Sequence, residues 1–356
     1  MTASGDEFWL IVQPTAAADE RLTTVVPELA RLGLDPFAAR QRLVGHGPAL
    51  LATGERTLLE KGADLLRAHR FVHWLLIPTP PRWAPERILA LRPTPGAIHF
   101  TCRHGEVVFP RDSPILAVLA DLSGKMPERQ MQRLVAQNAY RGAVSPATEE
   151  ELYLEVVRGE PVLDLYLLSL AGRPQHGVRI FPGRFDPQGL GELATYSATG
   201  NLEALLALVR EQAGSFSLHP EFGLASLPGC RPKPSKGGEQ RRQSLAALTR
   251  FGWLLTDLRQ AEARAETAGD QRPQTVTTAA TALLHPLTTG LGTTPILPLL
   301  ATAAAGSGAA WPVAAATAGN AGEPAAAPPI GLPPPPLAAE GDGNGGGFRP
   351  LAWFTG

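Results

Sequence analysis

The sequence of 356 residues predicts an α+β fold made of a small three-stranded α/β sandwich module, a second mixed α+β domain, one helix and a low-complexity, largely disordered tail. Short apolar runs typical of buried strands alternate with stretches in which apolar residues recur every three or four positions, as they do along one side of a helix. Gly (37 residues) and Pro (35 residues) concentrate in the last quarter, so the globular part is expected to end well before the chain does. The predicted boundaries are 1–80 for the first module, 86–230 for the second domain, 231–243 for a basic linker, 244–268 for an amphipathic helix and 269–356 for an Ala/Thr/Pro/Gly-rich tail.

Composition excludes several classes of protein. The formal net charge is -1 and charged residues make up 18%, so there is no general attraction to nucleic acid or to an anionic membrane. The two cysteines, Cys102 and Cys230, are too few for a disulfide scaffold and indicate a reducing cytoplasm. Residues 1–7 are polar and acidic, which does not fit a secretory signal. We therefore predict a cytoplasmic protein.

The first module is predicted from a strand at 8–12, an unbroken apolar run. The next helix carries its apolar residues at helical spacing between 19 and 32, and Gly33 is expected to end it in a left-handed conformation. Asp35 and Pro36 then suit the cap and the first position of a second helix. The remaining predicted elements are an edge strand at 48–52, a helix capped by Thr53 and a strand at 71–77.

This order of elements, with Arg-Leu-Gly-Leu-Asp-Pro at 31–36 and Pro-Ala-Leu-Leu-Ala-Thr-Gly at 48–54, resembles the C-terminal domain of the ribosomal stalk protein and the related Clp-protease adaptor fold. The resemblance covers about a fifth of the chain and implies a compact docking module without catalysis. The stalk domain presents a Lys-rich helix to its partners. Here the corresponding helices carry arginines and only Lys61 as lysine, so the partner surface of that family does not carry over.

The second domain contains one clear hairpin, in which β-rich runs at 97–102 and 106–109 flank a turn at Arg103-His104-Gly105. The apolar segment 114–122 fits either a core strand or a short buried helix. The other predicted elements are strands at 87–91, 162–170 and 177–182, helices at 127–139, 148–158 and 201–212, and a closing segment at 222–229.

The last third begins with basic residues among Pro and Gly, which indicate a solvated hinge, because the aromatic residues that stack on nucleic-acid bases are absent. A one-sided apolar pattern at 244–266 predicts a helix that packs on a domain or a partner. Residues 273–322 lack Asp, Glu, Lys and Arg, which raises the question of a membrane span. Their Ala, Thr and Gly content and the breaks at Pro298 and Pro312 argue against one.

Two groups of residues are candidates for chemistry. His99, Cys102 and His104 are the only cluster of metal-ligand types, but His99 and Cys102 point to opposite sides of a strand and no second pair lies nearby in the sequence. The weak catalytic candidates come from the second domain and combine carboxylates, a base and guanidinium groups: Asp164, His176, Arg179, Arg184 and Asp186. The alternative is a structural ion pair of one of these arginines with Asp164 or Asp186, and we favour it.

The sequence contains no phosphate loop, no nucleophile elbow and no zinc-protease motif, and we predict no cofactor. The leading hypothesis is a non-catalytic adaptor or scaffold whose partner is another protein. An enzyme or small-ligand-binding protein that uses the middle domain is the alternative, and a membrane-associated protein anchored by the residues after 273 is the second alternative.

Overall fold

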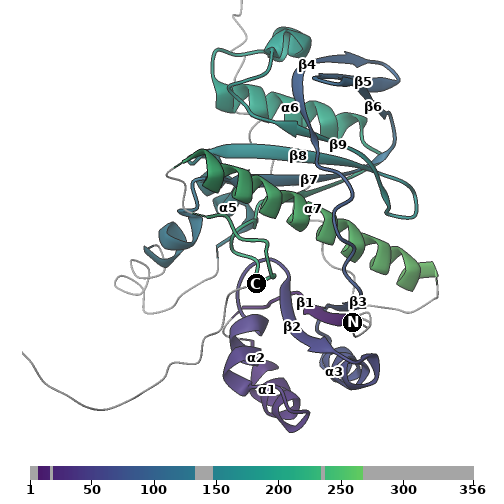
Figure 1. Ribbon diagram of the computed structural model, residues 1–356, viewed down its shortest axis with the longest axis vertical. Coiled ribbons are helices and arrows are strands. Elements are labelled where there is room, and N and C mark those ends of the chain that lie inside the picture. Colours follow the sequence, from purple (N-terminus) through teal and green to yellow (C-terminus); the bar gives the residue numbers. More distant parts are fainter. Residues whose placement is uncertain (1–6, 17–18, 133–146, 234–236, 268–356) are drawn as a thin grey trace, which may run out of the picture. The chain divides into compact units, whose positions relative to one another are not determined.

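The computed structural model describes residues 7–16, 19–132, 147–233 and 237–267, and it confirms the predicted α+β class (Figure 1). The described residues belong to one compact unit (1–294), which contains a sheet of three strands and a sheet of seven. The predictions for the tail and for the residues after 273 lie outside the described residues. So does most of the helix predicted at 127–139, of which 126–132 is described and helical.

The small sheet has the order β2-β1-β3, and both strand pairs are antiparallel. Helices α1, α2 and α3 bury their apolar residues against one face of this sheet, where Leu10 and Val12 of the central strand lie. The prediction of three paired strands covered by helices is confirmed, and β2 is an edge strand as expected. The bounds are β1 (Phe8–Val12), α1 (Leu22–Arg31), α2 (Pro36–Leu43), β2 (Ala49–Gly54), α3 (Arg56–Ala68) and β3 (His73–Leu76).

The helix ends follow the predicted chemistry at two places and depart from it at a third. Gly33 has φ +92°, and the Asp35 carboxylate accepts a hydrogen bond of 2.6 Å from the backbone N–H of Ala38. The prediction that Thr53 caps α3 is wrong. Thr53 belongs to β2, where it pairs with Trp9, because strand pairing continues to Gly54 before the helix starts.

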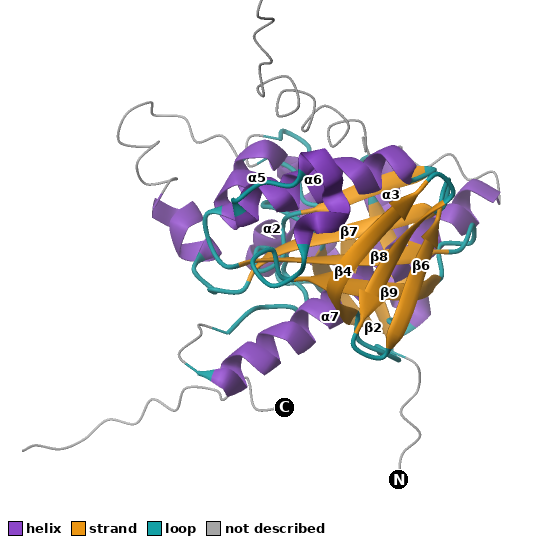
Figure 2. Cartoon of the chain, turned by 90° about the horizontal axis from the view of Figure 1, so that it is seen from above, coloured by secondary structure: helices purple, strands orange, loops and turns teal. Residues whose placement is uncertain are grey.

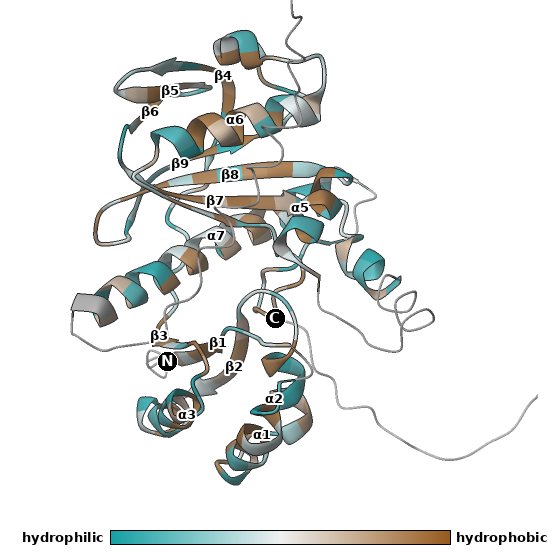
Figure 3. Cartoon of the chain, turned by 180° about the vertical axis from the view of Figure 1, so that it is seen from behind, coloured by the Kyte–Doolittle hydropathy of each residue, from teal (hydrophilic) through white to brown (hydrophobic). Residues whose placement is uncertain are grey.

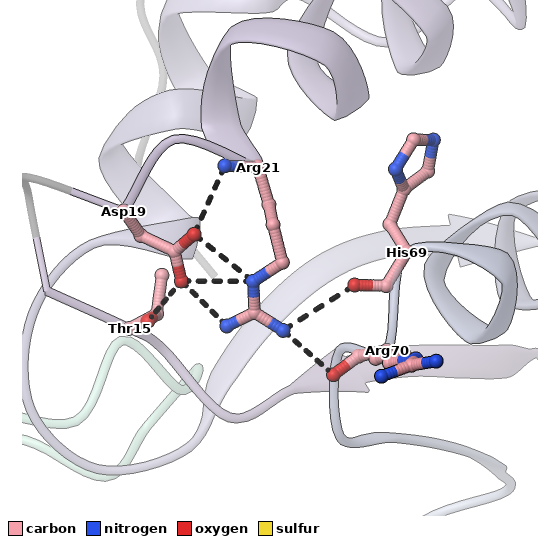
Figure 4. Close-up of polar contacts among 5 residues, drawn as sticks. All are labelled: Thr15, Asp19, Arg21, His69 and Arg70. Atoms are coloured by element: carbon pink, nitrogen blue, oxygen red, sulfur yellow. Dashed lines mark hydrogen bonds and ion pairs between the residues drawn. The ribbon is translucent and has the colours of Figure 1, made fainter.

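Arg21 ties the start of α1 to the end of α3 (Figure 4). Its guanidinium donates hydrogen bonds of 2.9 and 3.0 Å to Asp19, and of 3.3 and 2.9 Å to the carbonyl groups of His69 and Arg70. The last carbonyl groups of a helix have no partner within the helix, so Arg21 satisfies groups that would otherwise need water. The hydrogen bond from Arg21 holds the pKa of Asp19 well below its ordinary value.

The large sheet is mixed and has the order β10-β7-β8-β9-β4-β5-β6, with β10 parallel to β7 and β4 parallel to β9. Residues 114–121 form a strand and not a helix, which resolves that alternative. The bounds are β4 (Glu86–Thr94), β5 (Ala97–Cys102), β6 (Gly105–Pro110), β7 (Pro114–Asp121), α5 (Glu149–Val157), β8 (Pro161–Leu168), β9 (Pro174–Ile180), η1 (Pro187–Leu193), α6 (Ala198–Gln212), β10 (Ser215–His219) and α7 (Gly238–Thr267).

Both faces of β7 and β8 are buried, and both strands are apolar along most of their length (Figures 2 and 3). Successive side chains of a strand point to opposite faces. Leu163 and Leu165 accordingly pack on the face that α5 and α6 cover, whereas Val162 and Tyr166 pack on the face that α7 covers. The central strands therefore lie between two layers of helix.

Helix α7 contacts both sheets. Its apolar residues, such as Phe251 and Leu255, share one core with Tyr166 of the large sheet and with Trp74 of the small sheet. The connecting segment is held to the same helix: the N–H of Thr79 donates to Asp257 (2.7 Å), and Trp253 Nε1 donates to the carbonyl group of Trp83 (3.0 Å). Part of the small module's core is thus supplied by a helix near residue 250.

Helix α7 starts at Gly238 and not at the predicted residue 244. The residues after Gly238 are good helix formers, and Glu239 lies in the first turn, where the helix dipole favours a carboxylate.

Within the part of the chain that the structure describes, no helix is both long enough and apolar enough to cross a membrane.

Candidate functional site

Asp164 and Arg179, two of the predicted site residues, form a buried ion pair. They lie directly opposite each other on β8 and β9, and two hydrogen bonds of 2.6 Å join the guanidinium to the two carboxylate oxygens. Arg179 Nη2 also donates to Thr249 Oγ1 of α7 (3.0 Å). The exposed fractions of Asp164 and Arg179 are 0% and 6%. Burial raises the pKa of Asp164, and the charge and hydrogen bonds of Arg179 act against this shift.

The other three predicted residues do not join this pair. His176 is exposed on β9, and Arg184 is exposed in the following loop. Asp186 is exposed and accepts a hydrogen bond of 3.0 Å from the backbone N–H of Gln188, so it caps the short helix η1. The sequence favoured a structural ion pair of Arg179 or Arg184 with Asp164 or Asp186, and the structure pairs Arg179 with Asp164. None of the five residues lines the cleft described below.

The weak metal candidates are also spread apart. Cys102 packs in the core, where burial raises the pKa of its thiol to about 11 and Glu86 adds to the shift. This environment opposes the thiolate form that binds metal ions. His99 Nδ1 lies 3.2 Å from Glu106 Oε2, and His104 is in the exposed turn of the hairpin. Among the described residues, no three side chains of His, Cys, Asp or Glu are grouped to hold a metal ion.

Strand β10, which the sequence analysis did not identify, places a different set of polar residues. Its sequence Ser-Phe-Ser-Leu-His alternates between polar and apolar side chains, which is the signal that would have found it. Leu218 and Phe216 pack on the core beneath α6. Ser217 and His219 therefore point to the opposite face of the sheet, the face that α7 covers.

At the β10 edge of the large sheet lies a cleft of about 210 Å³. It is lined by residues from six parts of the chain that are distant in sequence: Gln13 after β1, the loop at 45–48, Trp74 of β3, the start of α5, the end of β10 and the second half of α7. Gly47 has φ +68°, and a Cβ atom built on it would lie 2.5 Å from Glu221, so only glycine fits this approach. His46 lies in the same turn and also lines the cleft.

Glu221 holds His219 in the cleft wall. Oε1 of Glu221 and Nδ1 of His219 are 2.9 Å apart, and the two side chains have exposed fractions of 14% and 20%. The Nε2 atom of His219 is buried and has no hydrogen-bond partner among the described residues. Buried polar atoms are almost always paired, so a buried ring nitrogen without a partner in a cleft indicates a place for a ligand atom.

Other polar groups line the same cleft. Arg259 Nη1 of α7 lies 3.1 Å from Glu262 Oε2, and both residues line the cleft. The backbone N–H of Ala147 donates to His46 Nε2 (3.3 Å). Ser217 lies on the same side of β10 as His219 without a hydrogen bond to its Nε2. A histidine oriented by a carboxylate can accept a hydrogen bond or a proton from a bound molecule.

Comparison with known proteins gives no further guidance to the site. No protein-family model matches the chain, and the comparisons with curated proteins and with solved structures found no match. The resemblance of residues 1–80 to the ribosomal stalk and Clp-adaptor domains therefore stays a prediction.

Proposed function

We propose that this protein binds a small molecule in the cleft beside His219. One observation carries the proposal: His219 lines a cavity, and its buried Nε2 atom has no hydrogen-bond partner among the described residues, while Glu221 fixes the ring through Nδ1. Ligand sites are typically concave, mostly apolar and furnished with a few placed polar groups. Here Trp74, Leu255 and Leu258 supply apolar surface next to the polar groups.

A thermal-shift screen of the full chain against a library of small metabolites tests this proposal. A ligand present at about 100 times its Kd is expected to stabilise the fold by about 2.7 kcal/mol. The stabilisation should be lost in His219→Leu and kept in His176→Leu, which removes an exposed histidine of the same sheet. A library without a stabiliser, or a stabiliser that acts equally on both variants, would contradict the proposal.

Binding to another protein, the leading hypothesis from the sequence, is the second candidate, and Phe37 favours it. The side chain of Phe37 is 76% exposed at the start of α2, and Arg40 on the same helix is also exposed. Exposed aromatic and arginine side chains are the residues that most often anchor protein interfaces. A pull-down should lose its partner with Phe37→Ala and keep it with Leu170→Ala, a control that removes another highly exposed apolar side chain (92%). Equal recovery with both variants would count against this candidate.

Deletion of residues 1–80 is a poor test of either function, because Ile11, Leu50 and Trp74 belong to the core around α7 and their removal would expose it. Single substitutions are the sharper choice. A cytoplasmic location is also proposed, and it is supported by the two cysteines, Cys102 and Cys230, which are both free and buried.

A further inference from the structure

The protonation of His219 determines what a ligand can offer it. A carboxylate only accepts hydrogen bonds, so in the neutral imidazole the proton lies on Nδ1, next to Glu221. Nε2 is then an acceptor with a free lone pair. The atom of a bound molecule that meets Nε2 must therefore be a donor, an N–H or an O–H.

The charges of the cleft favour a cation. Its charged side chains are two carboxylates, Glu221 and Glu262, and one guanidinium, Arg259, which leaves one net negative charge when the histidines are neutral. Arg259 lies 3.1 Å from Glu262, so its positive charge is already partnered. An anionic ligand would meet a net negative charge and an acceptor nitrogen, whereas both features favour a cationic ligand with an N–H donor.

The apolar lining and the volume limit the rest of the ligand. Trp74, Leu255 and Leu258 offer apolar contact, and an indole ring also attracts a cation. An engineered protein cavity of about 150 Å³ binds benzene, so a cleft of about 210 Å³ accepts a molecule of roughly that size or slightly larger.

We propose that the cleft binds a small organic cation with N–H donors, such as an arylalkyl ammonium or an amidinium compound. This inference rests on the proposed function and names its ligand class. The N–H group donates to Nε2 of His219, the net negative charge of the cleft favours the cation, and the apolar part packs against Trp74.

Isothermal titration calorimetry on the full chain at pH 8, where a free imidazole is neutral, tests the inference with five compounds of similar size. Benzylammonium and benzamidinium are cations with N–H donors, benzyltrimethylammonium is a cation without one, benzyl alcohol is neutral and benzoate is an anion. We expect one of the first two compounds to bind at least tenfold more tightly than each of the last three.

Glu221→Gln provides the decisive variant. A glutamine side chain can donate to Nδ1, which moves the proton to Nε2 and also removes one negative charge. We expect at least a tenfold loss of affinity for the preferred cation, and a gain for benzoate. Glu192→Gln removes the same charge from an exposed position of η1 and should change affinity less than twofold. If Glu221→Gln does not fold, His219→Leu replaces it in this test, because His219→Leu should also abolish cation binding.

The inference is overturned by tighter binding of benzyl alcohol, benzoate or benzyltrimethylammonium, or by cation binding that Glu221→Gln leaves unchanged. If such a compound binds and His219→Leu abolishes its binding, the proposed function stands and only the ligand class is wrong. If none of the five binds, the charge of the strongest stabiliser from the library decides: a cation with N–H donors supports the inference and any other ligand overturns it. If no compound of the library stabilises the protein, both the ligand-class inference and the proposed function are contradicted.

Discussion

Two buried or half-buried pairs of a carboxylate and a basic side chain lie on the α7 side of the large sheet, and they differ in what they leave unsatisfied. In the Asp164–Arg179 pair, both carboxylate oxygens accept hydrogen bonds from the guanidinium, which also donates to α7. In the Glu221–His219 pair, one ring nitrogen is held, and the other is buried and has no hydrogen-bond partner within the described part of the chain. The residue types alone do not show whether such a pair is structural or belongs to a binding site. The two pairs differ in whether all of their polar atoms have hydrogen-bond partners.

The largest effect is expected from breaking the Asp164–Arg179 pair. Asp164→Ala leaves the Arg179 guanidinium buried without a counter-charge and should lower the free energy of unfolding by about 3–5 kcal/mol. Urea denaturation measures this change. Asp64→Ala, which removes an exposed carboxylate paired with Arg67, should cost under about 1 kcal/mol. Similar costs for both variants would show that the buried pair is not structural.

Replacing both partners sharpens this test. Asp164→Leu combined with Arg179→Met removes the charges together, and such apolar replacements of a buried pair are often neutral or stabilising. We expect the double variant to be more stable than Asp164→Ala by about 2 kcal/mol or more in the same urea experiment. A double variant less stable than the single one would mean that the charges themselves are required.

Gly252 tests how closely α7 packs on the sheet next to the first pair. A Cβ atom on Gly252 would lie 2.2 Å from the hydroxyl oxygen of Tyr166, which is fully buried. Gly252→Ala should therefore destabilise the fold by about 1–3 kcal/mol through overpacking, although alanine raises helix propensity by about 1 kcal/mol. Thermal unfolding followed by circular dichroism measures the change. A stabilised variant would contradict this packing.

The Glu221–His219 pair should tolerate removal of its base better than the Asp164–Arg179 pair. His219→Leu takes away one hydrogen bond to a carboxylate with an exposed fraction of 14%, and the expected loss is about 1–3 kcal/mol in urea denaturation. A loss as large as that of Asp164→Ala would place His219 in the structural class and remove the contrast between the two pairs.

The smallest effect concerns pH and the contact between α1 and α3. Hydrogen bonding to Arg21 holds the pKa of Asp19 below its ordinary value of 3.8, so ionised Asp19 stabilises the fold above that value. This contribution is lost as the pH falls from about 4 towards the lower folded-state pKa. The stability difference between the wild type and Asp19→Asn should be full at pH 7 and shrink below pH 4. Asp64→Asn, an exposed carboxylate, is the control.

The sequence predicted most of the fold, because strands and helices leave local periodic patterns. It also anticipated a structural ion pair in this region, of Arg179 or Arg184 with Asp164 or Asp186, but it did not decide between these partners. It missed β10, because Ser-Phe-Ser-Leu-His is short and only half apolar. The cleft could not be predicted from local sequence patterns. It brings together the loop at 45–48, the end of β10 and α7, and this meeting depends on α7 packing against both sheets.

The contrast between the two pairs is tested most directly by a single thermal-shift measurement on two variants in the presence of a ligand identified for the wild type. His219→Leu should keep its fold and lose the ligand-induced shift, whereas the double replacement of Asp164 and Arg179 should keep the shift. The reverse result, a shift retained in His219→Leu and lost in the double variant, would place the binding site at the buried pair under α7 and contradict the assignment made here.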